Sequence, residues 1–118
     1  MYPEKLTRND LIDHGVVDVQ NEDVYVYGKK GKVRKLPFAH CIVKRKYVPN
    51  KIYPTVQFIS RKTGKNVNFA VARIIYAWNF GEVPEGLTVY HIDGNPFNND
   101  MSNLELVSVH ELAARRYM

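Results

Sequence analysis

A dense cluster of turn-forming residues near the C-terminus constrains this chain more than any other feature. Residues 87–91 have the composition of a short strand, and the sequence Asp-Gly-Asn-Pro at 93–96 favours an immediate reversal of the chain. The Asn98-Asn99 pair favours hydrogen bonds between side chains and nearby backbone, and Asn103 is placed to hold the loop closed. We therefore expect a rigid loop that returns as a second strand over residues 104–107.

A capping box fixes the start of the last helix. Ser108 is followed three residues later by Glu111, so Ser108 is the expected N-cap and Val109 the first helical residue. Val107 and Leu112 then occupy the positions of a hydrophobic staple. The sequence thus predicts two strands and a helix in a defined register.

The same residues resemble a known family. The sequence His-Ile-Asp-Gly-Asn at 91–95, the pair Asn98-Asn99 and the sequence Asn-Leu-Glu-Leu-Val-Ser at 103–108 resemble the HNH homing-type endonucleases, which are often encoded by phages. Upstream, residues 31–36 resemble the Gly-Arg-Val-Arg signature of the modular DNA-binding segment that often precedes these nucleases. Residues 70–80 resemble the helix before the motif. The resemblance implies a strand, strand and helix (ββα) nuclease fold.

The resemblance also implies a mechanism. His91 would be the general base that activates water against a DNA phosphodiester, a role that suits an imidazole titrating near neutral pH. Asn103 would orient the loop that carries His91. His110 would be the second histidine of the His-Asn-His motif. A divalent cation such as Mg²⁺ would stabilise charge at the phosphate.

The two positions from which the family binds its metal hold unsuitable residues here. The residue before the base, usually Asp or His, is Tyr90, and a phenol with a pKa of about 10 is a poor ligand for a hard cation. The position in the last helix, usually His or Asn, falls on Leu112, which has no donor atom. His110 lies about 200° away around the helix from Leu112. Asp93 and His110 therefore remain candidates for replacement metal ligands.

These departures leave three functions open. The chain is a DNA-binding protein of the HNH family that has lost cleavage, or an active endonuclease that recruits replacement ligands from itself or a partner. The third alternative is a phage protein that uses the fold for protein binding or assembly. Metal-dependent nicking that His91→Ala abolishes would separate the first two.

Segregated charge points to nucleic acid as the partner. Residues 24–81 contain no Asp or Glu and 13 Lys or Arg, whereas each flank sums to −4 within a net charge of +5. Positive charges held close together repel one another, and a polyanion such as double-stranded DNA would neutralise them. The alternative is a basic surface that is only solvated. The expected contacts are Lys29, Lys30, Lys32, Arg34, Lys35, Lys44, Arg45, Lys46, Arg61, Lys62 and Lys65.

The rest of the chain predicts an α+β fold. The sequence Thr-Arg-Asn-Asp at 7–10 favours a capped helix that ends at Gly15. Glycine-containing turns suggest two hairpins, with strands at 24–27 and 32–36 and at 55–60 and 65–69. Residues 38–47 suggest a further strand, and Pro49 and Pro54 are expected to bracket a loop. Apolar spacing predicts a buried helix from about residue 70 to 80.

These elements suggest one compact unit with three parts. The parts are an N-terminal helical segment (1–22), a basic hairpin segment (23–69), and a helix with the ββα motif (70–118). No apolar stretch is long enough to span a bilayer. We expect a protein of the cytoplasm, in a bacterial host or phage-infected cell. The lone Cys41 excludes an internal disulfide and is expected to be buried rather than catalytic.

Overall fold

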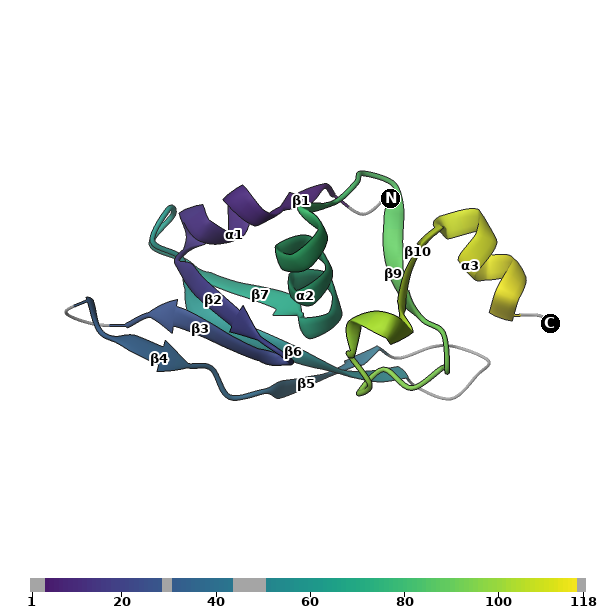
Figure 1. The fold of residues 1–118 in the computed structure, drawn as a ribbon, viewed down its shortest axis with the longest axis horizontal. Coiled ribbons are helices and arrows are strands. Elements are labelled where there is room, and N and C mark those ends of the chain that lie inside the picture. Colours follow the sequence, from purple (N-terminus) through teal and green to yellow (C-terminus); the bar gives the residue numbers. More distant parts are fainter. Residues whose placement is uncertain (1–3, 29–30, 44–50, 117–118) are drawn as a thin grey trace.

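The computed structural model describes residues 4–28, 31–43 and 51–116 and confirms the α+β class (Figure 1). The elements are β1 (Leu6–Thr7), α1 (Arg8–His14), β2 (Val16–Gln20), β3 (Asp23–Tyr27), β4 (Val33–Lys35), β5 (Ala39–Val43), β6 (Lys51–Ile59), β7 (Asn66–Ala70), α2 (Val71–Phe80), β8 (Glu82–Val83), β9 (Leu87–His91), the short 3₁₀ helix η2 (Met101–Asn103), β10 (Leu104–Ser108) and α3 (Val109–Arg116). No described helix has the length and hydropathy needed to cross a membrane.

The predicted N-terminal helix is confirmed, with its cap. The Thr7 side chain accepts a hydrogen bond from the Asp10 N–H at 3.0 Å, and the Asp10 carboxylate accepts one from the Thr7 N–H at 3.0 Å. These hydrogen bonds, first that from the Thr7 backbone, hold the pKa of Asp10 below its ordinary value. Gly15 ends α1 in the left-handed region with φ of 116°.

Gly15 also sits where two parts of the chain approach closely. A Cβ at this position would lie 3.1 Å from Cγ of Arg61, the first residue of the turn between β6 and β7. The Arg61 N–H donates to the His14 carbonyl at 2.9 Å, and the His14 ring bonds Ser60 at 2.6 Å. The helix end, including His14, is therefore joined to the tip of the second hairpin.

Both predicted hairpins are confirmed. β3 pairs with β4 in an antiparallel register that sets Tyr25 opposite Lys35, and β6 pairs with β7 with Val56 opposite Phe69. The expected strand within residues 38–47 is β5, which pairs with β6; residues 44–50 lie outside the described part. The sequence did not predict β2, which pairs with β3, or the short β1–β8 pair.

The expectation that Pro54 borders a loop is wrong. Pro54 lies inside β6, opposite His40 of β5. The pairing of β6 with β7 begins one residue later, where Thr55 faces Ala70. A proline is tolerated at this place because β6 is flanked by only one strand there, so the missing N–H removes no bond to β7.

A shared core connects the segments. It includes Leu11 of α1, Val24 of β3, Val56 of β6, Ile74 of α2 and Leu104 of β10, each less than a tenth exposed. The stripe predicted for α2 is buried at Val71, Ile74 and Ile75, with Trp78 packed against the core. The molecule measures 50 × 27 × 25 Å, with β9, β10 and α3 at one end of the long axis and the tips of both hairpins at the other (Figure 1).

The α1 cap gives the first prediction. Thr7→Ala should lower the free energy of unfolding by about 1 kcal/mol, because the Asp10 N–H loses its side-chain acceptor. Urea unfolding followed by circular dichroism measures the change. Asn9→Ala, at an exposed position of the same helix, is the control and should not destabilise the fold. Equal stability of the Thr7→Ala variant and the wild type would contradict the proposed role of the cap.

Candidate functional site

The candidate site is built on the loop between β9 and β10. The two strands pair in antiparallel register, with His91 opposite Leu104. The Ile92 N–H donates to the Asn103 carbonyl at 2.9 Å, which continues the ladder by one bond. The Gly94 N–H donates to the His91 carbonyl at 2.9 Å, and Gly94 has φ of 77°. The chain therefore reverses directly after His91, as the turn residues predict.

Asn103 closes this loop with its side chain. Its Oδ1 accepts from the Asp93 N–H at 3.0 Å, and its Nδ2 donates to Asp93 Oδ1 and to the Asn98 carbonyl, both at 2.9 Å. Asn103 is 8% exposed, so each of these bonds satisfies a polar atom that water reaches poorly. One buried amide thus joins the start, middle and end of the loop.

Asp93 is the matching acceptor on the exposed side of the loop. Its carboxylate also accepts from the Asn95 N–H at 2.8 Å and from Asn98 Nδ2 at 2.9 Å. The Asn98 side chain, the Asn95 backbone and the Asn103 side chain, in that order, hold the pKa of Asp93 below its ordinary value. The carboxylate that was a candidate metal ligand is engaged in holding the loop.

A second amide fixes the His91 ring. Asn99, which is 3% exposed, places its Oδ1 2.7 Å from His91 Nε2, while its Nδ2 donates to the Pro96 carbonyl at 3.3 Å. A carbonyl oxygen can only accept, so Nε2 of His91 carries the proton. Nδ1 is then the ring atom that can accept a proton when the imidazole is neutral. The sequence predicts that the Asn99 side chain forms hydrogen bonds with nearby backbone, and it does not predict this contact with His91.

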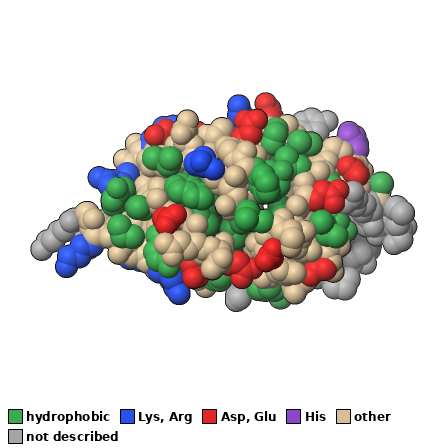
Figure 2. Space-filling model, viewed as in Figure 1, with side chains coloured by type: hydrophobic (Ala, Val, Ile, Leu, Met, Phe, Trp, Pro, Cys, Tyr) green, Lys and Arg blue, Asp and Glu red, His purple; other side chains and the backbone are tan. Residues whose placement is uncertain are grey.

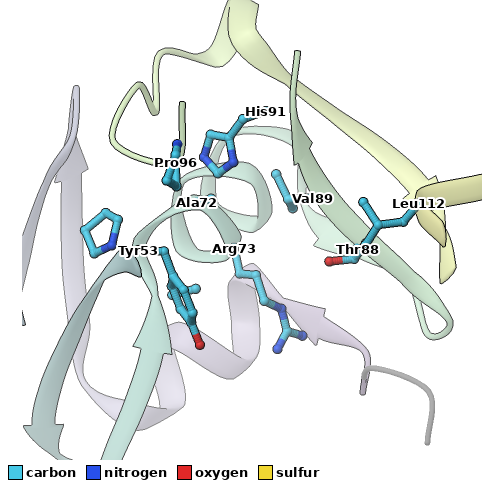
Figure 3. Close-up of a pocket in the computed structure, with 10 residues that line it drawn as sticks. Tyr53, Ala72, Arg73, Thr88, Val89, His91, Pro96 and Leu112 are labelled. Atoms are coloured by element: carbon cyan, nitrogen blue, oxygen red, sulfur yellow. The ribbon is translucent and has the colours of Figure 1, made fainter. Parts of the chain in front are cut away.

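His91 lines a cavity of about 300 Å³. The lining residues are Tyr53, Pro54, Ala70, Ala72, Arg73, Thr88, Val89, His91, Pro96 and Leu112. In Figure 3 the His91 ring lies beside Pro96, Leu112 approaches from the last helix near Thr88, and the side chains of Tyr53 and Arg73 lie on the opposite side. The cavity thus brings together β6, α2, β9 and α3.

Arg73 brings a positive charge to this cavity. Its Nη2 donates to the Glu4 carbonyl at 2.7 Å, whereas its buried Nε has no hydrogen-bond partner among the described residues. Burial lowers the pKa of Arg73, and the negative charge of Glu4 partly offsets that effect. Arg73 was not predicted as a site residue, because one arginine on a largely apolar helix does not by itself indicate a site.

Leu112 and Tyr90, at the two expected metal-ligand positions, differ in where they lie relative to the cavity. Leu112 faces the same cavity as His91. α3 begins at Val109 and the Glu111 N–H donates to Ser108 Oγ at 3.0 Å, which confirms the predicted helical register. Within the described ranges, neither Tyr90 nor His110 lines the cavity, and His110 is exposed. No three His, Cys, Asp or Glu in those ranges come together to hold a metal ion.

The described residues among the expected nucleic-acid contacts lie away from His91. Lys32, Arg34, Arg61, Lys62 and Lys65 are exposed on or beside the two hairpin tips, at the opposite end of the long axis from β9 and β10 (Figure 1). On the face drawn in Figure 2, Lys and Arg are concentrated toward that end, and Asp and Glu over the middle and the other end. The expected contacts Lys29, Lys30, Lys44, Arg45 and Lys46 fall outside the described residues.

Two contacts organise this basic end. The Arg61 guanidinium lies 4.7 Å from the centroid of the Tyr27 ring, so the second hairpin tip packs against the first hairpin. Lys35 lies 3.9 Å from the Asp23 carboxylate, which offsets part of its charge. The two hairpins therefore present their cations on neighbouring surfaces, separate from the His91 cavity.

Comparison with known proteins places the C-terminal part of the chain in context. A family model described as HNH endonuclease matches residues 69–114. A candidate HNH homing endonuclease from the SPbeta prophage, YosQ of Bacillus subtilis (strain 168), is 36% identical over 59 residues, which cover 50% of this chain and 34% of the relative. The chain thus spans about a third of the length of this curated relative. No solved structure matches the chain significantly.

Asn103 gives the second prediction. Asn103→Ala should lower the free energy of unfolding by about 2 kcal/mol, because Asp93 and the Asn98 carbonyl lose their hydrogen bonds to this buried side chain. It should also raise the pKa of Asp93 toward its ordinary value, since the Asn103 side chain is one of the groups that lower it. Urea unfolding and NMR titration of the Asp93 carboxyl measure the two effects. Asn68→Ala, at an exposed position of β7, is the control, and an unchanged Asp93 titration in Asn103→Ala would contradict the network.

Proposed function

Because this chain belongs to the HNH endonuclease family through residues 69–114, we propose that it is a DNA-binding member of the family in which metal-dependent cleavage is impaired. The observation that carries the proposal is the position of Leu112. Its side chain lines the cavity that holds His91, at the place where the family supplies a metal ligand from the last helix. An isobutyl group there can neither coordinate a cation nor accept a hydrogen bond.

The other possible donors do not replace Leu112. The Asp93 carboxylate is bonded to Asn95, Asn98 and Asn103. His110 is exposed on the other side of the helix. Mg²⁺ prefers carboxylate and water oxygens in a near-octahedral arrangement, so a phenol and an alkyl group at the two expected positions do not fit it. The cavity therefore lacks the donor atoms that a catalytic metal ion would need.

DNA binding is supported by charge and shape. The hairpins expose cations from an acid-free stretch of 58 residues, and such cations bind phosphates without reading sequence. The 50 Å long axis corresponds to about 15 base-pair steps along a duplex. A duplex lying along that axis would contact the basic hairpins at one end and the His91 loop at the other.

Endonuclease activity is the second candidate, and the state of His91 favours it. The Asn99 carbonyl holds Nε2–H, which leaves Nδ1 as the basic atom in the neutral ring. Thr88 and Arg73 line the same cavity, so a phosphate placed there would meet a hydroxyl and a cation. A general base and a positive charge are retained even though the metal positions are not.

DNA affinity gives the third prediction. The dissociation constant of a short duplex should rise steeply with salt, because bound phosphates release counterions. Lys62→Ala with Lys65→Ala should weaken binding to duplexes of any sequence and reduce the slope of log K against log salt by about 2. Fluorescence anisotropy across a salt series measures both quantities. Lys5→Ala is the control, because Lys5 lies 3.3 Å from Glu82 at a distance from the hairpin tips. A flat salt dependence would contradict DNA binding through these cations.

Nicking of supercoiled DNA gives the fourth prediction. The wild-type chain should leave the plasmid intact in Mg²⁺ or Mn²⁺. Restoring donors with Tyr90→Asp and Leu112→Asn should produce metal-dependent nicking and tighter Mn²⁺ binding, seen by electron paramagnetic resonance. Adding His91→Ala should abolish the nicking and leave Mn²⁺ binding in place. Metal-dependent nicking by the wild type that His91→Ala removes would instead establish the second candidate.

A further inference from the structure

The N-terminal hairpin reaches the His91 loop from outside the segment that matches the family model. β2 and β3 pair with Gln20 opposite Asp23, so Asn21 and Glu22 are the two central residues of a tight turn. Asn21 has φ of 55°, as the first central residue of such a hairpin turn can require. Asn21 and Glu22 line one depression together with Asn98, Asn99 and Asp100 of the loop. The hairpin turn and the loop therefore share a surface.

One hydrogen bond crosses this surface. The Asn99 N–H donates to Glu22 Oε1 at 2.8 Å, between residues 77 positions apart. A bond to a carboxylate is shorter and stronger than one between neutral groups. Asn99 is 3% exposed, so without Glu22 its N–H would lose its partner at a place that water reaches poorly. The position of Asn99 thus depends on the N-terminal hairpin.

The same asparagine continues to His91. Its backbone is held by Glu22 and its side-chain Oδ1 accepts from His91 Nε2 at 2.7 Å. The Asn99 side chain also donates to Pro96 at 3.3 Å, which sets the direction of the amide. A shift of the Asn99 backbone would move Oδ1 relative to the ring. Glu22, Asn99 and His91 form a chain of two hydrogen bonds from the hairpin to the cavity.

We propose that Glu22 is a positioning residue for His91. It holds the Asn99 backbone, and Asn99 in turn keeps the His91 ring in one orientation with its proton on Nε2. This inference goes beyond the proposed function, because it holds whether or not the chain cleaves DNA. The N-terminal part of the chain therefore contributes to a site whose recognisable residues all lie in the C-terminal part.

NMR of the chain without DNA or metal tests the proposal. In the wild type the His91 Nε2 proton should be visible in water and protected from solvent exchange, with its assignment made by its loss in His91→Gln. Glu22→Ala should accelerate exchange of this proton about tenfold or more, since the bond to Asn99 loses its support. Glu22→Gln should restore most of the protection, because its amide oxygen can still accept from the Asn99 N–H.

A matched control separates positioning from general loosening of the hairpin. Asp23→Asn removes one negative charge from the next residue, whose carboxylate lies near Lys35. This variant should leave the His91 Nε2 proton protected. Should Glu22→Ala fail to fold, Glu22→Asp carries the test, since a side chain one methylene shorter cannot keep the bond and the same loss is expected. Protection of His91 unchanged in the folded Glu22 variant, or lost equally in Asp23→Asn, would overturn the proposal. Measuring the exchange of this proton requires neither DNA binding nor cleavage.

Discussion

The need to satisfy buried amides organises the functional end of this protein. Asn103 and Asn99 are each less than a tenth exposed, and each uses its side chain to bond another part of the same loop. Because an unsatisfied buried polar group costs about 1–3 kcal/mol, the loop has few alternative conformations in which both amides are paired. The direction of the His91 ring follows from that constraint.

The loop and the cavity differ in chemistry. Hydrogen bonds hold the loop: Asn103 closes it, Asp93 accepts bonds within its turn, and Asn99 fixes Nε2 of His91. The cavity beside it is lined by Leu112, whose side chain has no atom that could coordinate a cation. The hydrogen bonds of the loop and the lining of the cavity thus depend on different residues.

Charge and site are also separated in space. The exposed cations of the two hairpins lie on or beside the hairpin tips, while His91 and Arg73 line a cavity near the other end of a 50 Å molecule (Figure 1). The antiparallel hairpins carry their tips away from β9, β10 and α3 (Figure 1).

The sequence by itself determined the features that depend on neighbours along the chain. Turn residues set the reversal after His91, and the capping residues set the starts of α1 and α3, which put Leu112 and His110 on different faces of α3. Only the tertiary structure decided the bond between Glu22 and Asn99, the pairing of β1 with β8, and the place of Pro54 in β6. The physical reason is range: caps and turns are satisfied within a few residues, whereas contacts 77 residues apart depend on how the whole core packs.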